Sequence, residues 1–255
     1  MNPEKLTNSE QKEKYGENVE MNVYLLRHAE KQSDQNLENV VGPEAVLSEK
    51  GVENAKEFGK ELKMKHPEFK GVKIYHSGID RAKTTGDLIA GESPTYSTRE
   101  RDSLILKGKI TQDAFNKIVE DTKVEGGNEA TMIQKLLDAD ETPLDEKSMT
   151  SREIGRIVAS NILRMVEMSK KLLSDSKVNI VFVSHAGMIE HFLVDLLKKE
   201  RPDFIKGYLA GGLGYLEGPE FCIKRDDKEK VSIQVKFRDE TFSVSEDELK
   251  TLSGK

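Results

Sequence analysis

The sequence lacks several features that mark particular classes of protein. It has 255 residues but one cysteine, Cys222, which excludes an intramolecular disulfide and fits a reducing compartment. No apolar run approaches the roughly 18 residues that a membrane-spanning helix needs, and the polar start of the chain does not resemble a signal peptide. A net charge of −6 argues against the basic face that duplex binding requires. These absences predict a cytoplasmic protein with neither a nucleic-acid nor a membrane partner.

The composition still leaves enough apolar sequence for a substantial core. Charged residues make up 34% of the chain and hydrophobic residues 36%, which predicts a very polar surface around one large domain. We expect a polar N-terminal tail over residues 1–20, a single domain over 21–244 and a C-terminal tail over 245–255. The sequence leaves open whether the true start is Met1 or Met21.

Three short apolar segments have the character of buried strands. Residues 22–26, 72–75 and 178–183 are rich in branched and aromatic side chains, and each precedes a segment with helical spacing. The following helices are expected over residues 49–65, after residues 77–85 to about 90, and over 188–199. This alternation predicts a largely parallel, Rossmann-like sheet with helices on both faces, a three-layer α/β/α sandwich.

Other segments predict additions to that sandwich. A long helix with an apolar stripe is expected over 151–173 with Ser151 as its N-cap, and residues 221–224 and 231–237 predict an antiparallel hairpin at the sheet edge. Residues 107–149 are polar and interrupted, with helices expected at 111–122 and 129–139. This helical insertion is either a lid or an ordinary surface hairpin, and the sequence does not separate the two.

Polar residues follow each of the three predicted parallel strands. Arg27 and His28 follow the first strand, Ser77 and Arg81 the second, and His185 the third. Ligands of open α/β sheets bind beyond the carboxyl ends of strands. Guanidinium groups suit a phosphate, and an imidazole beside them can act as a nucleophile. Each group alone would also suit a surface loop, but the repetition predicts a phosphate site.

Four motifs resemble those of a known family and occur in the same order along the chain. They are Leu26-Arg27-His28-Ala29-Glu30, Leu47-Ser48-Glu49-Lys50-Gly51 with Ala55, Ser77-Gly78-Ile79-Asp80-Arg81-Ala82 with Thr85, and Ser184-His185-Ala186-Gly187. Over roughly residues 21–220 the chain resembles the histidine phosphatase superfamily, the phosphoglycerate mutase-like group. The resemblance implies that His28 becomes phosphohistidine and that Arg27, Arg81 and His185 complete the phosphate pocket. It also implies a carboxylate general acid, for which Glu100 is the first candidate and Asp102 the second, and no metal or other cofactor.

The chemistry of these residue types fits those roles. Arg27 and Arg81 should lower the pKa of His28 and keep it neutral and nucleophilic. A protonated Glu100 could protonate the leaving group and then activate water. His76 is a candidate for supporting the pocket from behind, whereas His66 and His191 receive no catalytic role.

The motifs depart from those of the mutase branch. Ala29 replaces the glycine of the motif that the mutases resemble, Asp34 falls near an expected asparagine, and Gly78 stands where proline is common. Hydrolysis of a small phosphorylated substrate or a phosphoprotein is therefore expected, with phosphoglycerate-type mutase activity or non-catalytic phosphate binding as alternatives. Specificity should come from residues 107–149 and 31–46, and the oligomeric state is open.

Overall fold

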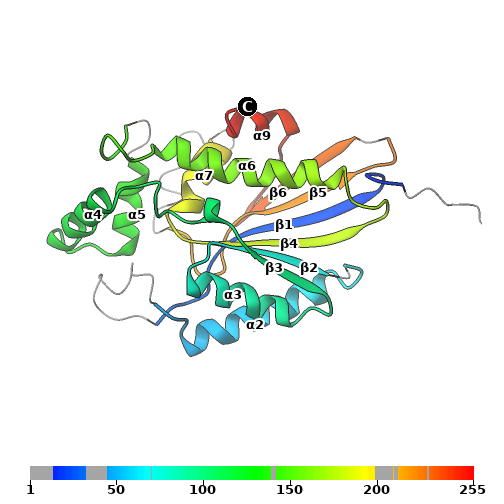
Figure 1. The fold of residues 1–255 in the computed structure, drawn as a ribbon, viewed down its shortest axis with the longest axis horizontal. Helices are drawn as coiled ribbons and strands as arrows, with labels where there is room; N and C mark the ends of the chain where they lie inside the picture. The colour runs from blue at the N-terminus through cyan, green and yellow to red at the C-terminus, as the bar shows by residue number, and fades with distance from the viewer. Residues whose placement is uncertain are drawn as a thin grey trace, which may run out of the picture.

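The computed structural model describes residues 14–32, 45–69, 71–138, 142–198, 209, 212–228 and 230–255. A seven-stranded sheet with the order β3-β2-β4-β1-β5-β6-β7 forms its centre (Figure 1). Strands β3, β2, β4 and β1 are parallel, and β5 to β7 add to β1 in antiparallel fashion. Their bounds are β1 Val19–Arg27, β2 Val72–His76, β3 Tyr96–Glu100, β4 Lys177–Ser184, β5 Glu220–Arg225, β6 Val231–Phe237 and β7 Glu240–Ser243.

Helices cover both faces of the sheet, as Figure 1 shows. Helices α2 (Glu49–Lys65) and α3 (Asp80–Gly91) pack together on one face, and α6 (Ser151–Ser169) and α7 (Met188–Leu197) pack together on the other. Helices α4 (Gln112–Val124) and α5 (Glu129–Asp138) form the insertion, preceded by the short 3₁₀ helix η1 (Asp102–Leu104). The insertion lies beyond the end of the sheet where the parallel strands terminate (Figure 1). The predicted three-layer α/β/α sandwich with an antiparallel edge is confirmed.

The central strands are apolar because they are buried on both sides. In β1, Met21, Val23 and Leu25 join the core under α6 and α7, while Tyr24 and Leu26 join the core under α2 and α3. Successive side chains of a strand point to opposite faces, so a strand between two helical layers favours apolar residues on both faces. This explains the continuous apolar runs in the sequence.

Helix caps agree with the prediction in α2 and correct it in α6. Ser48 Oγ accepts a hydrogen bond from the backbone N–H of Gly51 at 2.9 Å, as an N-cap does. Helix α6, however, is capped by Thr150, which forms a capping box with Glu153. Ser151 is already inside the helix and contacts His191 Nδ1 at 2.5 Å. The helix ends at Ser169, short of the predicted residue 173.

The predicted tails are corrected in part. Residues after Val244 form helix α9 (Glu246–Leu252), which packs on α6 and has Leu249 fully buried. The short segment has a single buried apolar anchor, which is too weak a pattern to read from the sequence. Near the other end, β1 begins at Val19 and Tyr15 forms a bridge with Leu173, while residues 1–13 lie outside the described residues.

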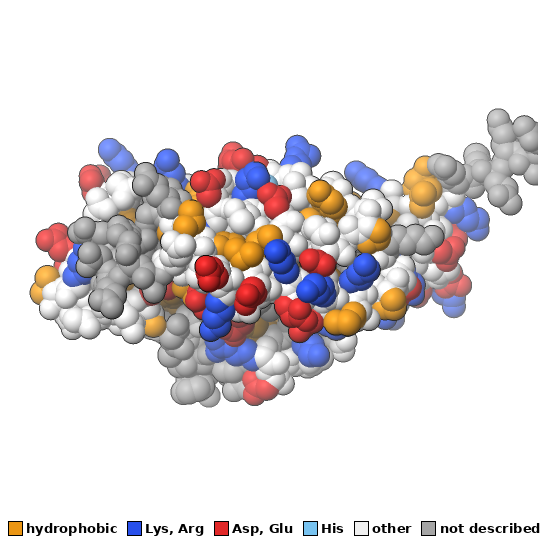
Figure 2. Space-filling model, turned by 90° about the horizontal axis from the view of Figure 1, so that it is seen from below, with side chains coloured by type: hydrophobic (Ala, Val, Ile, Leu, Met, Phe, Trp, Pro, Cys, Tyr) orange, Lys and Arg blue, Asp and Glu red, His pale blue; other side chains and the backbone are white. Residues whose placement is uncertain are grey.

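The surface of the described residues is highly charged and mixed in sign. On the side that carries α2 and α3, Figure 2 shows Lys and Arg side chains interspersed with Asp and Glu rather than gathered by sign. Among the helices of the described ranges, none is long and apolar enough to cross a membrane.

Candidate active site

The three predicted strand ends meet at one edge of the sheet. The register pairs Arg27 of β1 with Ser184 of β4, and His76 of β2 with Val183 of β4. The backbone N–H of His28 continues this pattern by donating to the carbonyl of Ser184 at 3.0 Å. The predicted phosphate-pocket residues are all buried, with exposed fractions of 7% or less: Arg27, His28, Arg81 and His185.

His28 is held in one orientation and one protonation state. Its Nδ1 donates to the carbonyl of Ala29 at 2.8 Å, which leaves Nε2 with the lone pair. Arg81 Nε donates to that Nε2 at 3.0 Å. Burial lowers the pKa of His28 well below its usual value, and His185, Arg81 and Arg27 lower it further. The predicted influence of the arginines is thus present, but burial is the larger cause.

Arg27 is fixed by groups from two distant parts of the chain. Its Nη1 donates to the carbonyl of Leu213 at 2.6 Å, and its Nη2 donates to Glu129 Oε2 at 2.7 Å. The guanidinium also lies over the ring of Tyr215, 4.3 Å from its centroid. Within the described part of the chain, Nε is buried and has no hydrogen-bond partner. Nε is therefore available to a ligand.

The loop that carries Leu213 and Tyr215 lies along the end of β1. The N–H of Arg27 donates to the carbonyl of Glu217, and the N–H of Leu216 donates to the carbonyl of Arg27, at 3.0 and 3.1 Å. Gly218 permits this close approach, because a Cβ at that position would lie 1.8 Å from the carbonyl oxygen of Leu25. The close fit places the Tyr215 ring against His28, with 5.9 Å between centroids.

His185 faces His28 across the pocket, with ring centroids 5.2 Å apart. Its Nε2 lies 2.6 Å from Ser77 Oγ, while its buried Nδ1 has no partner among the described residues. Burial lowers the pKa of His185 well below its usual value, as do Arg81, Arg27 and Lys31. His185 is therefore neutral and has one ring nitrogen available.

Thr85 connects helix α3 to the loop after His28. The backbone N–H of Ala29 donates to Thr85 Oγ1 at 3.0 Å, and that hydroxyl donates to the carbonyl of Arg81 at 2.7 Å. The hydroxyl thereby holds the histidine loop and the arginine helix at a constant separation, which accounts for the threonine in the third motif.

Two charged residues of the pocket were not identified from the sequence. Lys31 has a side chain that is 4% exposed, and its Nζ lies 3.5 Å from Glu129 Oε1. Burial lowers the pKa of Lys31 to about 8, with Arg81 and Arg27 lowering it and Glu129 raising it. In a chain this rich in charge, no local pattern distinguishes Lys31 from a surface lysine, and none directs Glu129 of the insertion toward β1.

The candidate acids Glu100 and Asp102 line an adjoining cavity. This cavity has a volume of about 640 Å³ and includes Ser77, whose hydroxyl contacts His185. Glu100 is exposed and lies against Gly78, where an added Cβ would be 2.2 Å from Glu100 Oε1. Gly78 has φ +80°, a conformation that favours glycine. No hydrogen bond joins Glu100 or Asp102 to His28 in the described residues, so Ser77 is the connection between cavity and pocket.

The remaining histidines have supporting positions. His76 Nδ1 accepts a hydrogen bond from the N–H of Gly78 at 3.2 Å and so stabilises the turn beside the cavity. His66 contacts the Tyr24 hydroxyl at 3.2 Å, and His191 contacts Ser151. Within the described ranges, no three His, Cys, Asp or Glu side chains form a metal-binding cluster.

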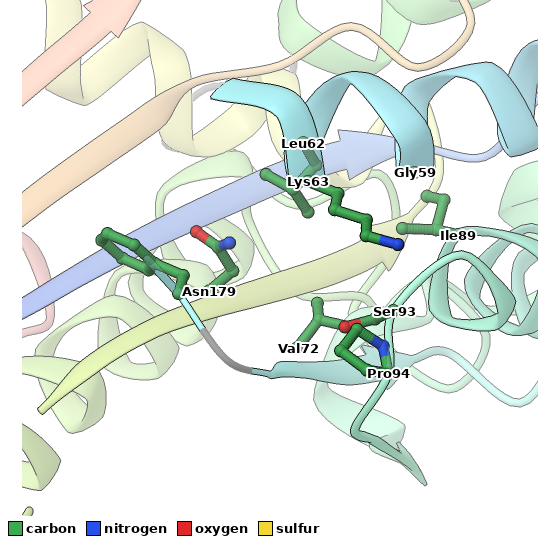
Figure 3. A pocket seen from close by; sticks show the side chains of 9 residues that line it. Gly59, Leu62, Lys63, Val72, Ile89, Ser93, Pro94 and Asn179 are labelled. Atoms are coloured by element: carbon green, nitrogen blue, oxygen red, sulfur yellow. The ribbon is translucent and has the colours of Figure 1, made fainter. Parts of the chain in front are cut away.

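A second, smaller hollow lies away from this chemistry. Figure 3 shows it between α2 and the first residues of β2 and β4, with Leu62, Val72 and Asn179 in its wall. Those strands deliver the phosphate-pocket groups at their opposite, carboxyl ends. The hollow is therefore a packing gap.

Comparison with known proteins agrees with this geometry. Residues 23–109 match the sequence profile of the histidine phosphatase superfamily (branch 1). YhfR of Bacillus stearothermophilus is 18% identical, with 89% of this chain and 98% of that chain covered and a TM-score of 0.55. A mycobacterial glucosyl-3-phosphoglycerate phosphatase solved with VO3 is 17% identical, with 86% and 98% covered and a TM-score of 0.54.

A structure described as mycobacterial hydrolase 2 is 16% identical, with 92% of this chain and 97% of that chain covered and a TM-score of 0.55. No curated protein matches the sequence significantly. At these identities the structural likeness concerns the fold, while the profile match covers the segment that carries Arg27, His28 and Arg81. The profile match thus relates residues 23–109 to the histidine phosphatase superfamily, and the solved structures show that the chain shares their fold.

Proposed function

We propose that this protein hydrolyses phosphate monoesters, or phosphohistidine, through a covalent intermediate on His28 Nε2. The observation that carries the proposal is a buried, neutral His28 whose Nε2 lone pair faces Arg81 at 3.0 Å. A neutral imidazole beside fixed cations is the arrangement that attack on an anionic phosphate requires.

The charge of the pocket suits a phosphate dianion. Arg27, Lys31 and Arg81 are cations, Glu129 is a carboxylate, and both pocket histidines are neutral, so the net charge is plus two. Arg27 Nε is an unused donor, and His185 Nδ1 becomes one when Ser77 donates to Nε2. These groups would bind the phosphoryl oxygens and offset charge as it redistributes in the transition state.

The reaction would proceed in two steps. In the first, Nε2 of His28 forms a bond to phosphorus while the ester P–O bond breaks, and the departing oxygen takes a proton from Glu100, with Asp102 as the alternative donor. In the second, the same carboxylate removes a proton from water, which attacks phosphorus and breaks the P–N bond. Phosphate leaves, and His28 returns to its neutral state.

The leaving group would occupy the cavity beside Ser77. Glu100, Asp102, Lys107 and Lys109 all line it, so both signs of charge are available to a polar substrate. A small phosphorylated compound or a phosphorylated protein side chain fits this description. We place the activity in the cytoplasm and assign no metal to the reaction, because side chains supply the cations.

The test is hydrolysis of p-nitrophenyl phosphate in EDTA by the wild type, by His28→Ala and by His66→Ala as a matched control outside the pocket. We expect activity in the wild type and the control only, and phosphate trapped on His28 after alkaline quenching. Full activity of His28→Ala would refute the proposal. Transfer of phosphate to a sugar acid in the presence of a bisphosphate primer would indicate a mutase, and binding without turnover a phosphate-binding protein.

A further inference from the structure

Glu129 connects the helical insertion to the phosphate pocket. It is the first residue of α5, and its two carboxylate oxygens contact two different cations. Oε2 lies 2.7 Å from Arg27 Nη2, and Oε1 lies 3.5 Å from Lys31 Nζ. Both cations lie about one hundred residues earlier in the chain, so this contact is a tertiary one and not a consequence of helix spacing.

Glu129 completes the set of contacts that immobilises Arg27. With Nη1 on the carbonyl of Leu213, Nη2 on Glu129 and the guanidinium face on Tyr215, rotation of the group is blocked. Nε, which is buried and has no partner among the described residues, is then presented in one direction. A carboxylate–guanidinium contact is well suited to this purpose because it combines charge with defined hydrogen-bond geometry.

Glu129 also acts on Lys31. The buried ammonium of Lys31 is close to the guanidiniums of Arg27 and Arg81, and burial and both guanidiniums disfavour its positive charge. Glu129 is the carboxylate that opposes them, and its own pKa is lowered by Arg27 and Lys31 although burial raises it. Without Glu129, the lysine would lose its proton more readily.

We propose that Glu129 is a positioning residue of the phosphate pocket, which orients Arg27 and keeps Lys31 charged. This inference rests on the proposed function and assigns part of the machinery to the insertion. The pocket is complete only when α5 is docked on the end of β1. In this proposal the insertion, for which the sequence left a lid and a surface hairpin open, is a structural part of the site.

The alternative role of Glu129 predicts the opposite effect on phosphate binding. A carboxylate bound to Arg27 could instead compete with phosphate for the guanidinium, and removing it would then strengthen phosphate binding. The two roles are distinguished by measuring phosphate affinity and turnover in the same variants.

The experiment compares Glu129→Ala, Glu129→Gln and Glu125→Gln. Glu125 is an exposed residue of the same insertion that pairs with Lys135 at 2.8 Å, so its variant controls for general effects on the insertion. Melting temperatures verify folding. The readouts are kcat and KM for p-nitrophenyl phosphate, and the Kd of inorganic phosphate by calorimetry from pH 6.5 to 9.5.

For Glu129→Ala we expect at least a tenfold fall in kcat and a higher Kd for phosphate. Glu129→Gln should restore most of the kcat at pH 6.5, because its amide oxygen can accept from Arg27. In both variants the alkaline loss of phosphate binding should move to lower pH, because the charge of Glu129 no longer offsets that of Arg27 and Arg81 at Lys31. If Glu129 only stabilised the insertion, its replacement would not change the pH at which phosphate binding is lost.

Tighter phosphate binding with unchanged kcat would overturn the proposal in favour of competition. Behaviour of Glu129→Ala like that of Glu125→Gln would also overturn it. If the wild type binds phosphate but does not hydrolyse esters, the proposed function fails, and the Kd values still decide the role of Glu129. If the wild type binds no phosphate, both are refuted.

Discussion

Replacing Lys31 with methionine separates the contribution of this buried amine to stability from its contribution to phosphate binding. The fold lowers the pKa of Lys31 from 10.5 to about 8, and one unit corresponds to about 1.4 kcal/mol. The charged amine therefore costs about 3 kcal/mol at pH 7, as an upper bound. Methionine retains a similar apolar stem without the charge, so Lys31→Met should raise the free energy of unfolding while weakening phosphate binding at least tenfold.

The dependence of this effect on pH has a definite sign. Below pH 8 both the folded and the unfolded state carry the proton, so the full penalty acts on the wild type. Between pH 8 and 10.5 the unfolded state binds more protons, so the stability of the wild type rises with pH relative to the variant. The advantage of Lys31→Met should therefore be greatest at pH 7 and shrink toward pH 10.5.

Urea denaturation at several pH values measures this advantage directly. Lys50→Met is the matched control, because the Lys50 side chain is 71% exposed and pairs with Glu30 at 3.6 Å. Its effect should stay within about 0.5 kcal/mol. A Lys31→Met variant less stable than the wild type at pH 7, or an advantage that does not change with pH, would refute the reasoning.

Two further predictions concern the surroundings of the pocket. Gly78→Ala should reduce the free energy of unfolding by about 1 kcal/mol, because residue 78 has a positive φ. The added Cβ should also displace Glu100, so kcat should fall more for phenyl phosphate, whose leaving group needs the acid more, than for p-nitrophenyl phosphate. Equal losses would count against Glu100 as the acid. His191 is fully buried with a pKa lowered to about 3, so the unfolded state binds its proton first on acidification. Between pH 6.5 and 3 the wild type should lose about 1.4 kcal/mol of its free energy of unfolding per pH unit through this residue. In His191→Gln, which does not titrate, the free energy of unfolding should fall less steeply with decreasing pH. Identical slopes in the two proteins would contradict the assignment.

Where the apolar pattern is strong, the sequence was sufficient to predict the structure. The segments that became β1, β2 and β4 are buried on both faces, so their runs and the helices after them were recognisable, and the groups at their ends could be expected to meet. Strand β3 was not predicted because all five of its residues are exposed and carry polar or charged side chains. Backbone hydrogen bonds pair β3 with β2, and the pattern of side chains gives no indication of this pairing.

The parts of the site that escaped prediction depend on long-range contacts. The predicted pocket residues, which are Arg27, His28, Arg81 and His185, follow strands. Lys31 and Glu129 become part of the pocket only because α5 packs at the end of β1. Leu213 contributes a backbone carbonyl, which no side-chain pattern reveals. Glu100 was expected on the basis of resemblance, and the structure places it in the adjoining cavity, where its role as the acid is proposed.

The position of β1 at the centre of the sheet has a consequence for the time course of synthesis. Its neighbours on either side are β4 and β5, whose residues begin at Lys177 and Glu220. A nascent chain therefore exposes the apolar residues of β1 until β4 and β5 have left the ribosome, and pairing over such separations is slow. Strand β1, which leads to His28, is made before both of its neighbours, so its apolar residues should need protection from aggregation during translation.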